Sequence, residues 1–337
     1  MGPALHAETE LWEGEIDGAP YTVAAPAGWS GGKAFFHVHG WRPAHAPHLA
    51  DLDLTNRFYQ RLLESGWLIG RTAFQENGVD HDAHTVALRD LRAWIEAERG
   101  AIEMLVLEGE STAGTLVLRI AEQDADLADG VIALGPFIDL ADETKDSFLT
   151  ARPQLPAILM TNITEIGDDA GYVAVAADHG FSPALRPLLR PGHVNVNWVE
   201  RWDAVQDMAA AIRGGVAPVL TSGSREVPPR ETGTVKEDHA IRNQVTAVNV
   251  FYGNAFLGFH PGELTAAGIH QGESYEVESG GDSWSVFYGE SYGDVPEGEW
   301  VMFPTADEEI MLVRNHQSAI KTANLSVGDV VRIHLPE

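Results

Sequence analysis

The chain has 337 residues, of which 44% are hydrophobic and 21% charged; 50 acidic residues face 22 basic ones, for a formal net charge of −28. This composition is typical of a globular protein of about two domains and argues against disorder. The negative charge disfavours nucleic acid and anionic membranes as partners. Because Cys is absent, disulfides, thiolate nucleophiles and Cys-ligated zinc are excluded.

No apolar run reaches the roughly 18 residues that a membrane-spanning helix needs. The N-terminus, Met1–His6, lacks the basic start and the apolar stretch of a signal peptide. We therefore expect a cytoplasmic protein, and a mature secreted form behind a new Met stays open as the alternative.

The first two thirds of the chain alternate strand-like apolar runs with amphipathic stretches. The expected strands are Ala34–His39, Leu68–Phe74, Met104–Leu107, Val131–Leu134, Ala157–Met160 and Val194–Asn197. The expected helices are Asn56–Ser65, His84–Arg99, Thr115–Gln123 and Trp202–Arg213. This alternation is typical of βαβ units, so we predict an α/β domain with a mostly parallel sheet over residues 1–220.

The pattern changes after Pro218. Residues 221–240 are polar, contain a Pro pair and read as a linker. Residues 241–337 carry short strand-like runs separated by Gly-rich turns, and only Ser318–Ala323 has a helical pattern. We predict a small all-β domain there, either a sandwich or a barrel.

The sharpest local motif lies between an expected strand and an expected helix. The apolar run ending at Leu107 leads into the small-residue turn Gly109–Ala113 and then into the helix from Thr115. This is the layout of a nucleophile elbow, G-x-S-x-G, with Ala113 at the last position. It predicts Ser111 as a nucleophile whose hydroxyl the tight turn exposes; the alternative is an ordinary turn in which Ser111 caps the helix.

An oxyanion hole needs two backbone donors near the nucleophile. Around such an elbow, one N–H comes from the loop after an earlier strand and the other from the residue after the nucleophile. The strand Ala34–His39 ends at a His-Gly pair, so the expected donors are Trp41 (or Gly40) and Thr112. A Gly beside the donor lets the backbone approach a substrate.

The base and the acid of a triad follow the nucleophile along the chain. His193, in a loop beyond the last α/β crossover, is the expected base, and His179 is the competing candidate. The acid is expected after the strand Ala157–Met160, where register favours Glu165 over Asp168. Its role would be to hold the His tautomer and stabilise the imidazolium.

Two His-containing segments invite a metal interpretation. His37 and His39 alternate on one expected strand, and residues 80–84 form a dense His/Asp run. Neither has the H-E-x-x-H spacing or a clear third ligand, so we expect no metal. P-loop and dinucleotide glycine motifs are missing as well, so we expect no cofactor.

Residues from about 10 to 218 resemble an α/β-hydrolase. The matching pieces are His39–Trp41, Leu63–Leu68, Gly109–Gly114 and Arg190–His193. The resemblance implies a Ser-His-acid hydrolase acting on carboxylic esters. The Gly-x-x-Pro segment Gly215–Pro218, at the end of this part of the chain, is similar to the segment that ends the domain in a group of esterases and peptidase-like hydrolases. The short stretch between Gly135 and Leu155 implies a reduced lid, which argues against a long-chain lipase.

The last hundred residues resemble another family. Phe251–Asn254, Tyr292–Glu299 and Leu325–Val331 are similar to the C-terminal β-barrel of the S-adenosylmethionine hydroxide adenosyltransferases, the chlorinase and fluorinase relatives. That family's N-terminal domain is not seen here, so we carry over no adenosyl chemistry. We expect the barrel either to mediate homo-oligomerisation or to wall one side of the hydrolase cleft.

The sequence therefore predicts a serine hydrolase that cleaves a small-molecule ester through an acyl-enzyme. The residues expected to take part are Ser111, His193 and Glu165 in catalysis, Trp41 and Thr112 as oxyanion donors, and Gly40, Glu110 and Phe137 in substrate contacts. An amidase or peptidase with the same triad is one alternative. A non-catalytic binding protein that uses its barrel is the other.

Overall fold

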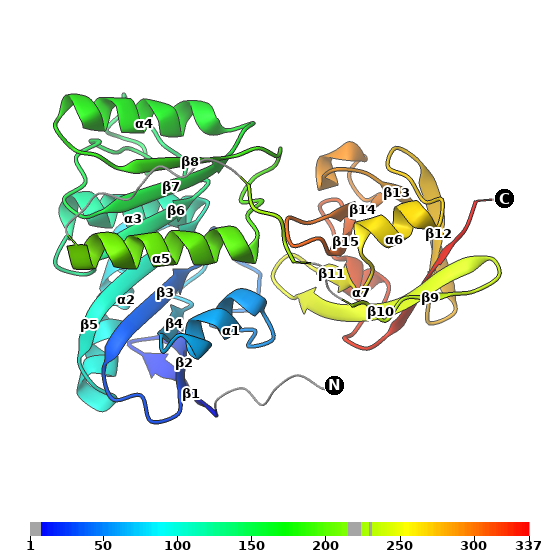
Figure 1. The fold of residues 1–337 in the computed structure, drawn as a ribbon, viewed down its shortest axis with the longest axis horizontal. Coiled ribbons are helices and arrows are strands. Elements are labelled where there is room, and N and C mark those ends of the chain that lie inside the picture. Colours follow the sequence, from blue (N-terminus) through cyan, green and yellow to red (C-terminus); the bar gives the residue numbers. More distant parts are fainter. Residues whose placement is uncertain (1–7, 215–223, 229–230, 337) are drawn as a thin grey trace. The chain divides into compact units, whose positions relative to one another are not determined.

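The computed structural model describes residues 8–214, 224–228 and 231–336. The chain divides into two compact units, Met1–Glu226 and Val227–Glu337 (Figure 1). The division falls inside the segment 221–240 that the sequence predicts as a linker, while the ending Gly215–Pro218 lies outside the described residues. Within the described ranges, no helix combines the length and the apolar character needed to cross a membrane.

The described residues of the first unit form an eight-stranded sheet with the order β1-β2-β4-β3-β5-β6-β7-β8. Its strands are β1 Thr9–Ile16, β2 Ala19–Pro26, β3 Gly32–Val38, β4 Leu68–Thr72, β5 Ile102–Glu110, β6 Gly130–Leu134, β7 Ala157–Asn162 and β8 Ala184–Leu188. Strand β2 pairs antiparallel with β1 and β4, and every pairing from β4 to β8 is parallel. The carboxyl ends of β3 to β8 therefore lie at one edge of the sheet.

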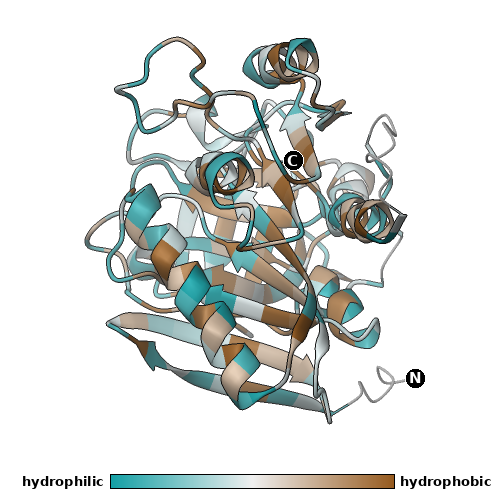
Figure 2. Ribbon diagram, turned by 90° about the vertical axis from the view of Figure 1, so that its left-hand side faces the viewer, coloured by the Kyte–Doolittle hydropathy of each residue, from teal (hydrophilic) through white to brown (hydrophobic). Residues whose placement is uncertain are grey.

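Helices cover both faces of this sheet. They are α1 Arg57–Glu64, α2 His81–Glu98, α3 Thr112–Gln123, α4 Ile166–Asp178 and α5 Trp198–Gly214. One apolar core joins the sheet to α2, α3 and α4, and a second joins the other face to α1 and α5. Strands buried on both faces read as continuous apolar runs, which is why they stand out in the sequence. Figure 2 shows these hydrophobic strands at the centre and polar residues on the outer sides of the helices.

This strand order and layering are those of the α/β-hydrolase fold, and the predicted fold class is confirmed. The lid is reduced as expected: residues 135–156, all of them described, contain no helix. The predicted strand Val194–Asn197 is wrong, because the last described strand of the first unit is β8 and Val194 has a left-handed φ of 52° in a loop. Strand β8 tolerates Pro187 because it pairs only with β7 at the sheet edge.

The second unit contains a closed β-barrel. In its described part, seven strands close in the order β10-β11-β15-β14-β13-β12-β16, with β16 pairing back to β10 and β9 added on β10. The bounds are β9 Val235–Lys236, β10 Ala240–Asn249, β11 Asn254–Leu257, β12 Ser274–Ser279, β13 Asp282–Tyr288, β14 Trp300–Pro304, β15 Ile310–Arg314 and β16 Val330–His334. This unit has an apolar core of its own.

Among the described residues of this unit, three short helical turns accompany the barrel strands: α6 Pro261–Ala266, η1 Tyr292–Asp294 and α7 Ala319–Thr322. The sequence predicts only α7, so the expectation of a single helix is wrong. Helix α6 has a start signal that could have been recognised, because Pro261 opens the helix and the side chains of His260 and Glu263 form a capping box.

Candidate active site

Ser111 sits on a strained turn between β5 and α3. Its φ of 57° and ψ of −121° lie outside the regions that L residues ordinarily adopt. The turn is so tight that a Cβ at Gly109 would lie 2.0 Å from the Ala113 carbonyl oxygen. Ser111 occupies the N-cap position of α3, yet its side chain makes no capping hydrogen bond. The hydroxyl is thus held away from the helix, as a nucleophile requires.

His193 connects Ser111 to a carboxylate. Its Nε2 lies 2.8 Å from Ser111 Oγ, and its Nδ1 lies 2.9 and 3.0 Å from the two carboxylate oxygens of Glu165. Because a carboxylate only accepts, Nδ1 carries the hydrogen and Nε2 can accept from the Ser111 hydroxyl. The three residues follow β5, β7 and β8, whose carboxyl ends meet at one edge of the sheet.

Two side chains connect the loop that carries Glu165 to the loop that carries His193. The buried Asn162, at the end of β7, donates to the carbonyls of Arg190 (3.3 Å) and Asn195 (3.1 Å), and its Oδ1 accepts from Asn195 N–H (2.9 Å). Thr164 Oγ1 donates to the carbonyl of Gly192 (3.1 Å). These contacts set where His193 stands relative to Glu165. Sequence reasoning missed them, since Asn and Thr near strand ends are common.

The competing candidates lie elsewhere on α4. Asp168 is exposed in the first turn of that helix, and His179 is its exposed C-cap residue. The carboxyl group that reaches the His193 ring belongs to Glu165, and the ring that reaches Ser111 belongs to His193.

The end of β3 lies against the nucleophile turn. A Cβ at Gly40 would lie 2.8 Å from the Glu110 carbonyl oxygen and 3.2 Å from Ser111 Cβ, so only glycine allows this approach. Trp41 follows directly, with a half-exposed side chain. Thr112 is the first residue of α3, where backbone N–H groups have no acceptor within the helix and the dipole favours negative charge. Both predicted oxyanion donors thus belong to segments that adjoin Ser111.

Phe137 forms an aromatic wall at the site. Its ring stacks on the His193 ring with centroids 5.3 Å apart and an interplanar angle of 29°, and half of the residue is exposed. The buried Thr115 hydroxyl holds the Phe137 backbone, donating to its carbonyl (2.6 Å) and accepting from its N–H (3.1 Å). The ring is therefore positioned before any substrate arrives.

A buried chain of charges ends at Glu110, the residue before the nucleophile. Arg201 of α5 forms an ion pair with the fully buried Glu108 and donates to His37 Nδ1 at 2.9 Å. His37 Nε2 in turn lies 3.5 Å from Glu110. Burial alone would raise the pKa of Glu110, but His37 and the guanidinium groups of Arg201 and Arg71 outweigh it and hold that pKa below its usual range. Glu110 is thus a fixed anion beside Ser111.

The metal interpretation of His37 does not fit this arrangement, because both of its ring nitrogens already face protein partners. Among the described residues, no three His, Asp or Glu side chains are grouped so that they could hold a metal ion. Sequence reasoning missed Glu108 and Arg201, which lie far apart along the chain and carry no motif.

No protein-family model and no curated protein matches the chain. Among solved structures, a putative dienelactone hydrolase from Klebsiella pneumoniae is 13% identical with a TM-score of 0.49, the match covering 61% of this chain and 99% of that one. An esterase from Pyrobaculum calidifontis is 16% identical with a TM-score of 0.46, over 62% and 84%. An uncharacterized conserved protein from Thermotoga maritima is 19% identical with a TM-score of 0.29, over 38% of this chain and about half (49%) of that one.

At such identities and TM-scores, these likenesses carry no argument about function. By its own strand order and layering, the first unit has an α/β-hydrolase-like fold, and the second unit contains a closed β-barrel.

Proposed function

We propose that the first unit is a serine hydrolase that cleaves carboxylic esters through an acyl-enzyme on Ser111. The observation that carries the proposal is the pair of contacts made by His193, with Ser111 Oγ at 2.8 Å on one side and Glu165 at 2.9 Å on the other. The strained backbone of Ser111, which keeps its hydroxyl out of the helix cap, supports the same role.

In this mechanism Ser111 Oγ attacks the ester carbonyl while His193 Nε2 takes its proton. Glu165 keeps the proton on Nδ1 in place and stabilises the imidazolium that forms. The oxyanion is held by the backbone N–H groups of Trp41 and Thr112. His193 then protonates the leaving alcohol. A water molecule, activated by the same imidazole, hydrolyses the acyl-enzyme and releases the carboxylic acid.

The experiment that tests the proposal is labelling with a fluorophosphonate probe, read by intact mass and peptide mapping. We expect one adduct on Ser111 in the wild type and none in Ser111→Ala or His193→Ala. Ester hydrolysis should fall by about 10⁴-fold or more in both variants. His179→Ala is the matched control, because this exposed histidine caps α4 away from Ser111 and should leave labelling unchanged.

Labelling of another residue, or full esterase activity in Ser111→Ala, would refute the proposal. Preference for esters over amides is a separate question, because both substrates pass through the same acyl-enzyme. Values of kcat/KM for matched ester and amide substrates decide it, and we expect the ester to be preferred.

For the second unit, the likeness to the adenosyltransferase barrel stays a prediction from the sequence. Calorimetry with S-adenosylmethionine and adenosine measures whether the barrel binds such ligands. Its proposed role in homo-oligomerisation is open to sedimentation analysis of the full chain and of the chain without residues 227–337.

A further inference from the structure

Both ring nitrogens of His193 are already engaged. Nδ1 faces the Glu165 carboxylate and Nε2 faces Ser111 Oγ, and the hydrogen-bonding positions of an imidazole lie in the plane of its ring. A further group that acts on this ring must therefore lie over one of its faces. The ring becomes positively charged when Nε2 takes the proton of Ser111, so the chemistry of the group over that face bears on the rate.

The segment Gly135–Phe137, directly after β6, lies against this ring. Phe137 stacks on it, with ring centroids 5.3 Å apart and ring planes inclined by 29°. A Cβ at Gly135 would lie 3.4 Å from both Cε1 and Nδ1 of His193, so the backbone also passes close to the ring. One short segment thus contacts the imidazole at two points.

This segment is fixed at its start and in its middle. Gly135 N–H donates to the carbonyl of Met160, at 2.9 Å, which ties the segment to β7. Pro136 packs against α3, because a Cβ at Gly114 would lie 3.1 Å from Pro136 Cα. The approach to His193 therefore does not depend on a freely moving loop.

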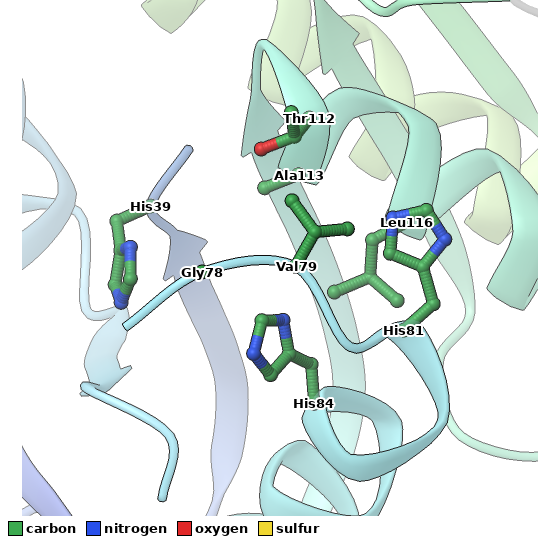
Figure 3. Close-up of a pocket in the computed structure, with 8 residues that line it drawn as sticks. All are labelled: His39, Gly78, Val79, His81, His84, Thr112, Ala113 and Leu116. Carbon is green, nitrogen blue, oxygen red and sulfur yellow. The ribbon is translucent and has the colours of Figure 1, made fainter. Parts of the chain in front are cut away.

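The first turn of α3 holds the aromatic residue itself. Figure 3 shows the side of this turn on which Thr112, Ala113 and Leu116 line a small pocket. Thr115, one residue before Leu116, uses its buried hydroxyl instead to bond both the N–H and the carbonyl of Phe137. The stacked ring is thus attached to a backbone that α3 fixes, although half of the residue is exposed.

The face of a phenyl ring is electron-rich and attracts a cation that lies over it. In the mechanism above, the imidazole of His193 gains a positive charge as Ser111 attacks, so its attraction to Phe137 grows on the way to the transition state. An interaction that is stronger in the transition state than before it lowers the barrier. An aliphatic side chain at this position would cover the imidazole without this attraction.

We propose that Phe137 speeds acylation by stabilising the imidazolium of His193 through a cation–π interaction. The inference rests on the proposed ester hydrolysis and concerns the stage at which the proton from Ser111 Oγ resides on His193 Nε2, before it passes to the leaving alcohol. Because Phe137 acts through His193, it is a positioning residue. A cation–π attraction at a half-exposed site changes a rate by about two- to fivefold.

The test replaces Phe137 in the full chain by phenylalanines that carry one, two or three ring fluorines, which withdraw electrons from the ring face and change its shape little. We expect kcat/KM for ethyl butyrate and for 4-nitrophenyl butyrate to fall stepwise, by about two- to fivefold in the trifluorinated protein. The rate of fluorophosphonate labelling at Ser111 should fall by a similar factor. Phe137→Leu, which stays apolar but lacks the ring, should lose at least as much.

The same fluorinated series at Phe181, which packs against the apolar core, is the control and should leave all three rates unchanged. Rates that do not depend on the number of fluorines at position 137 would overturn the proposal. A change confined to the KM of the aromatic ester would overturn it too, because Phe137 would then act as a substrate contact.

If Phe137→Leu does not fold, the fluorinated series still decides, because it retains the ring. A wild-type protein that takes up no fluorophosphonate at Ser111 would refute the proposed function itself. A wild type that is labelled, with rates that are equal along the fluorinated series, would refute only the role of Phe137. The labelling result therefore separates the two failures.

Discussion

Ser111 occupies a backbone conformation that a residue with a side chain rarely adopts. Its φ of 57° and ψ of −121° cost roughly 1–3 kcal/mol, which the surrounding contacts must offset. Among these contacts, Ser111 N–H donates to the carbonyl of Leu134 at 2.8 Å, which ties the turn to β6. The strain keeps the hydroxyl free, so at this residue stability is exchanged for reactivity.

This strain predicts an unequal effect of two substitutions. Ser111→Gly should unfold at a higher temperature than Ser111→Ala, because glycine adopts positive φ without strain whereas alanine retains it. After the entropy that glycine adds to the unfolded chain, the difference should be about 1 kcal/mol. Thermal unfolding of both variants measures it, and both should lack activity. An equal or lower midpoint for Ser111→Gly would show that the turn is not strained.

Asp169 is a second residue in an unfavourable environment, because its surroundings disfavour the ionised form of its carboxyl group. It is 99% buried in α4, and burial, with the nearby charges of Glu165 and Asp168, raises its pKa to about 7 from the usual 3.8. Between these two values the folded protein keeps this proton while the unfolded chain loses it. The contribution of Asp169 to stability is therefore present below about pH 4 and is lost as the pH rises to 7.

Asp169→Asn should thus stabilise the protein at pH 8, by up to about 4 kcal/mol, and change little at pH 4. Urea unfolding at the two pH values measures the difference. Asp168→Asn, at the exposed neighbouring position, is the matched control and should be nearly neutral at both. A stabilisation that is equal at pH 4 and pH 8 would contradict the assigned proton.

At the scale of elements, the site depends on loops that a parallel sheet brings together. Ser111, Glu165 and His193 follow three different strands, and the pairing of these strands in one sheet brings them together although they are far apart along the chain. Loops are more mobile than strands, so the loops that carry these side chains need additional hydrogen bonds to hold them in place. Asn162 provides these hydrogen bonds, because its buried side-chain amide is hydrogen-bonded to the backbone on both sides of His193.

Asn162→Ala should therefore lower kcat by about 10- to 100-fold while changing KM little, because the imidazole loses its fixed position. The labelling rate of Ser111 should fall in parallel. Asn56→Ala is a control of the same residue type, since it removes the N-cap of α1 and costs about 1 kcal/mol of stability. If Asn56→Ala loses as much activity, the effect of Asn162 is one of general stability.

At the scale of the whole molecule, each of the two units has an apolar core of its own. The two apolar clusters of the first unit lie on the two faces of its sheet, and the described part of the second unit has two clusters of its own. Ser111, His193 and Glu165 all belong to the first unit. The net charge of −28 predicts that the chain repels polyanions.

We expect residues 1–226 expressed alone to fold and to retain fluorophosphonate labelling of Ser111. Residues 227–337 should unfold cooperatively on their own, because seven strands close into a barrel and, among the described residues, only the two-residue β9 is left at an edge. Circular dichroism melts and labelling of the two fragments measure this. A first fragment that is folded but unlabelled would show that the barrel completes the site.

The sequence by itself determined the strands and helices with strong periodicity, the elbow at Ser111 and the order of the triad candidates. These are local features, since apolar runs, glycine spacing and turn chemistry act over a few residues. It misassigned Val194–Asn197, whose alternating Val and Asn mimic a strand although the loop is held by Asn162.

Only the tertiary structure decided which distant side chains meet. It brought Glu165 rather than Asp168 to His193, buried Glu108 against Arg201, and gathered His39, His81 and His84 around one pocket. Strand order and the packing of helices on the sheet determine these long-range contacts, and neither is visible in a short stretch of sequence. Contacts between residues far apart in sequence are therefore where the specificity of this site arises.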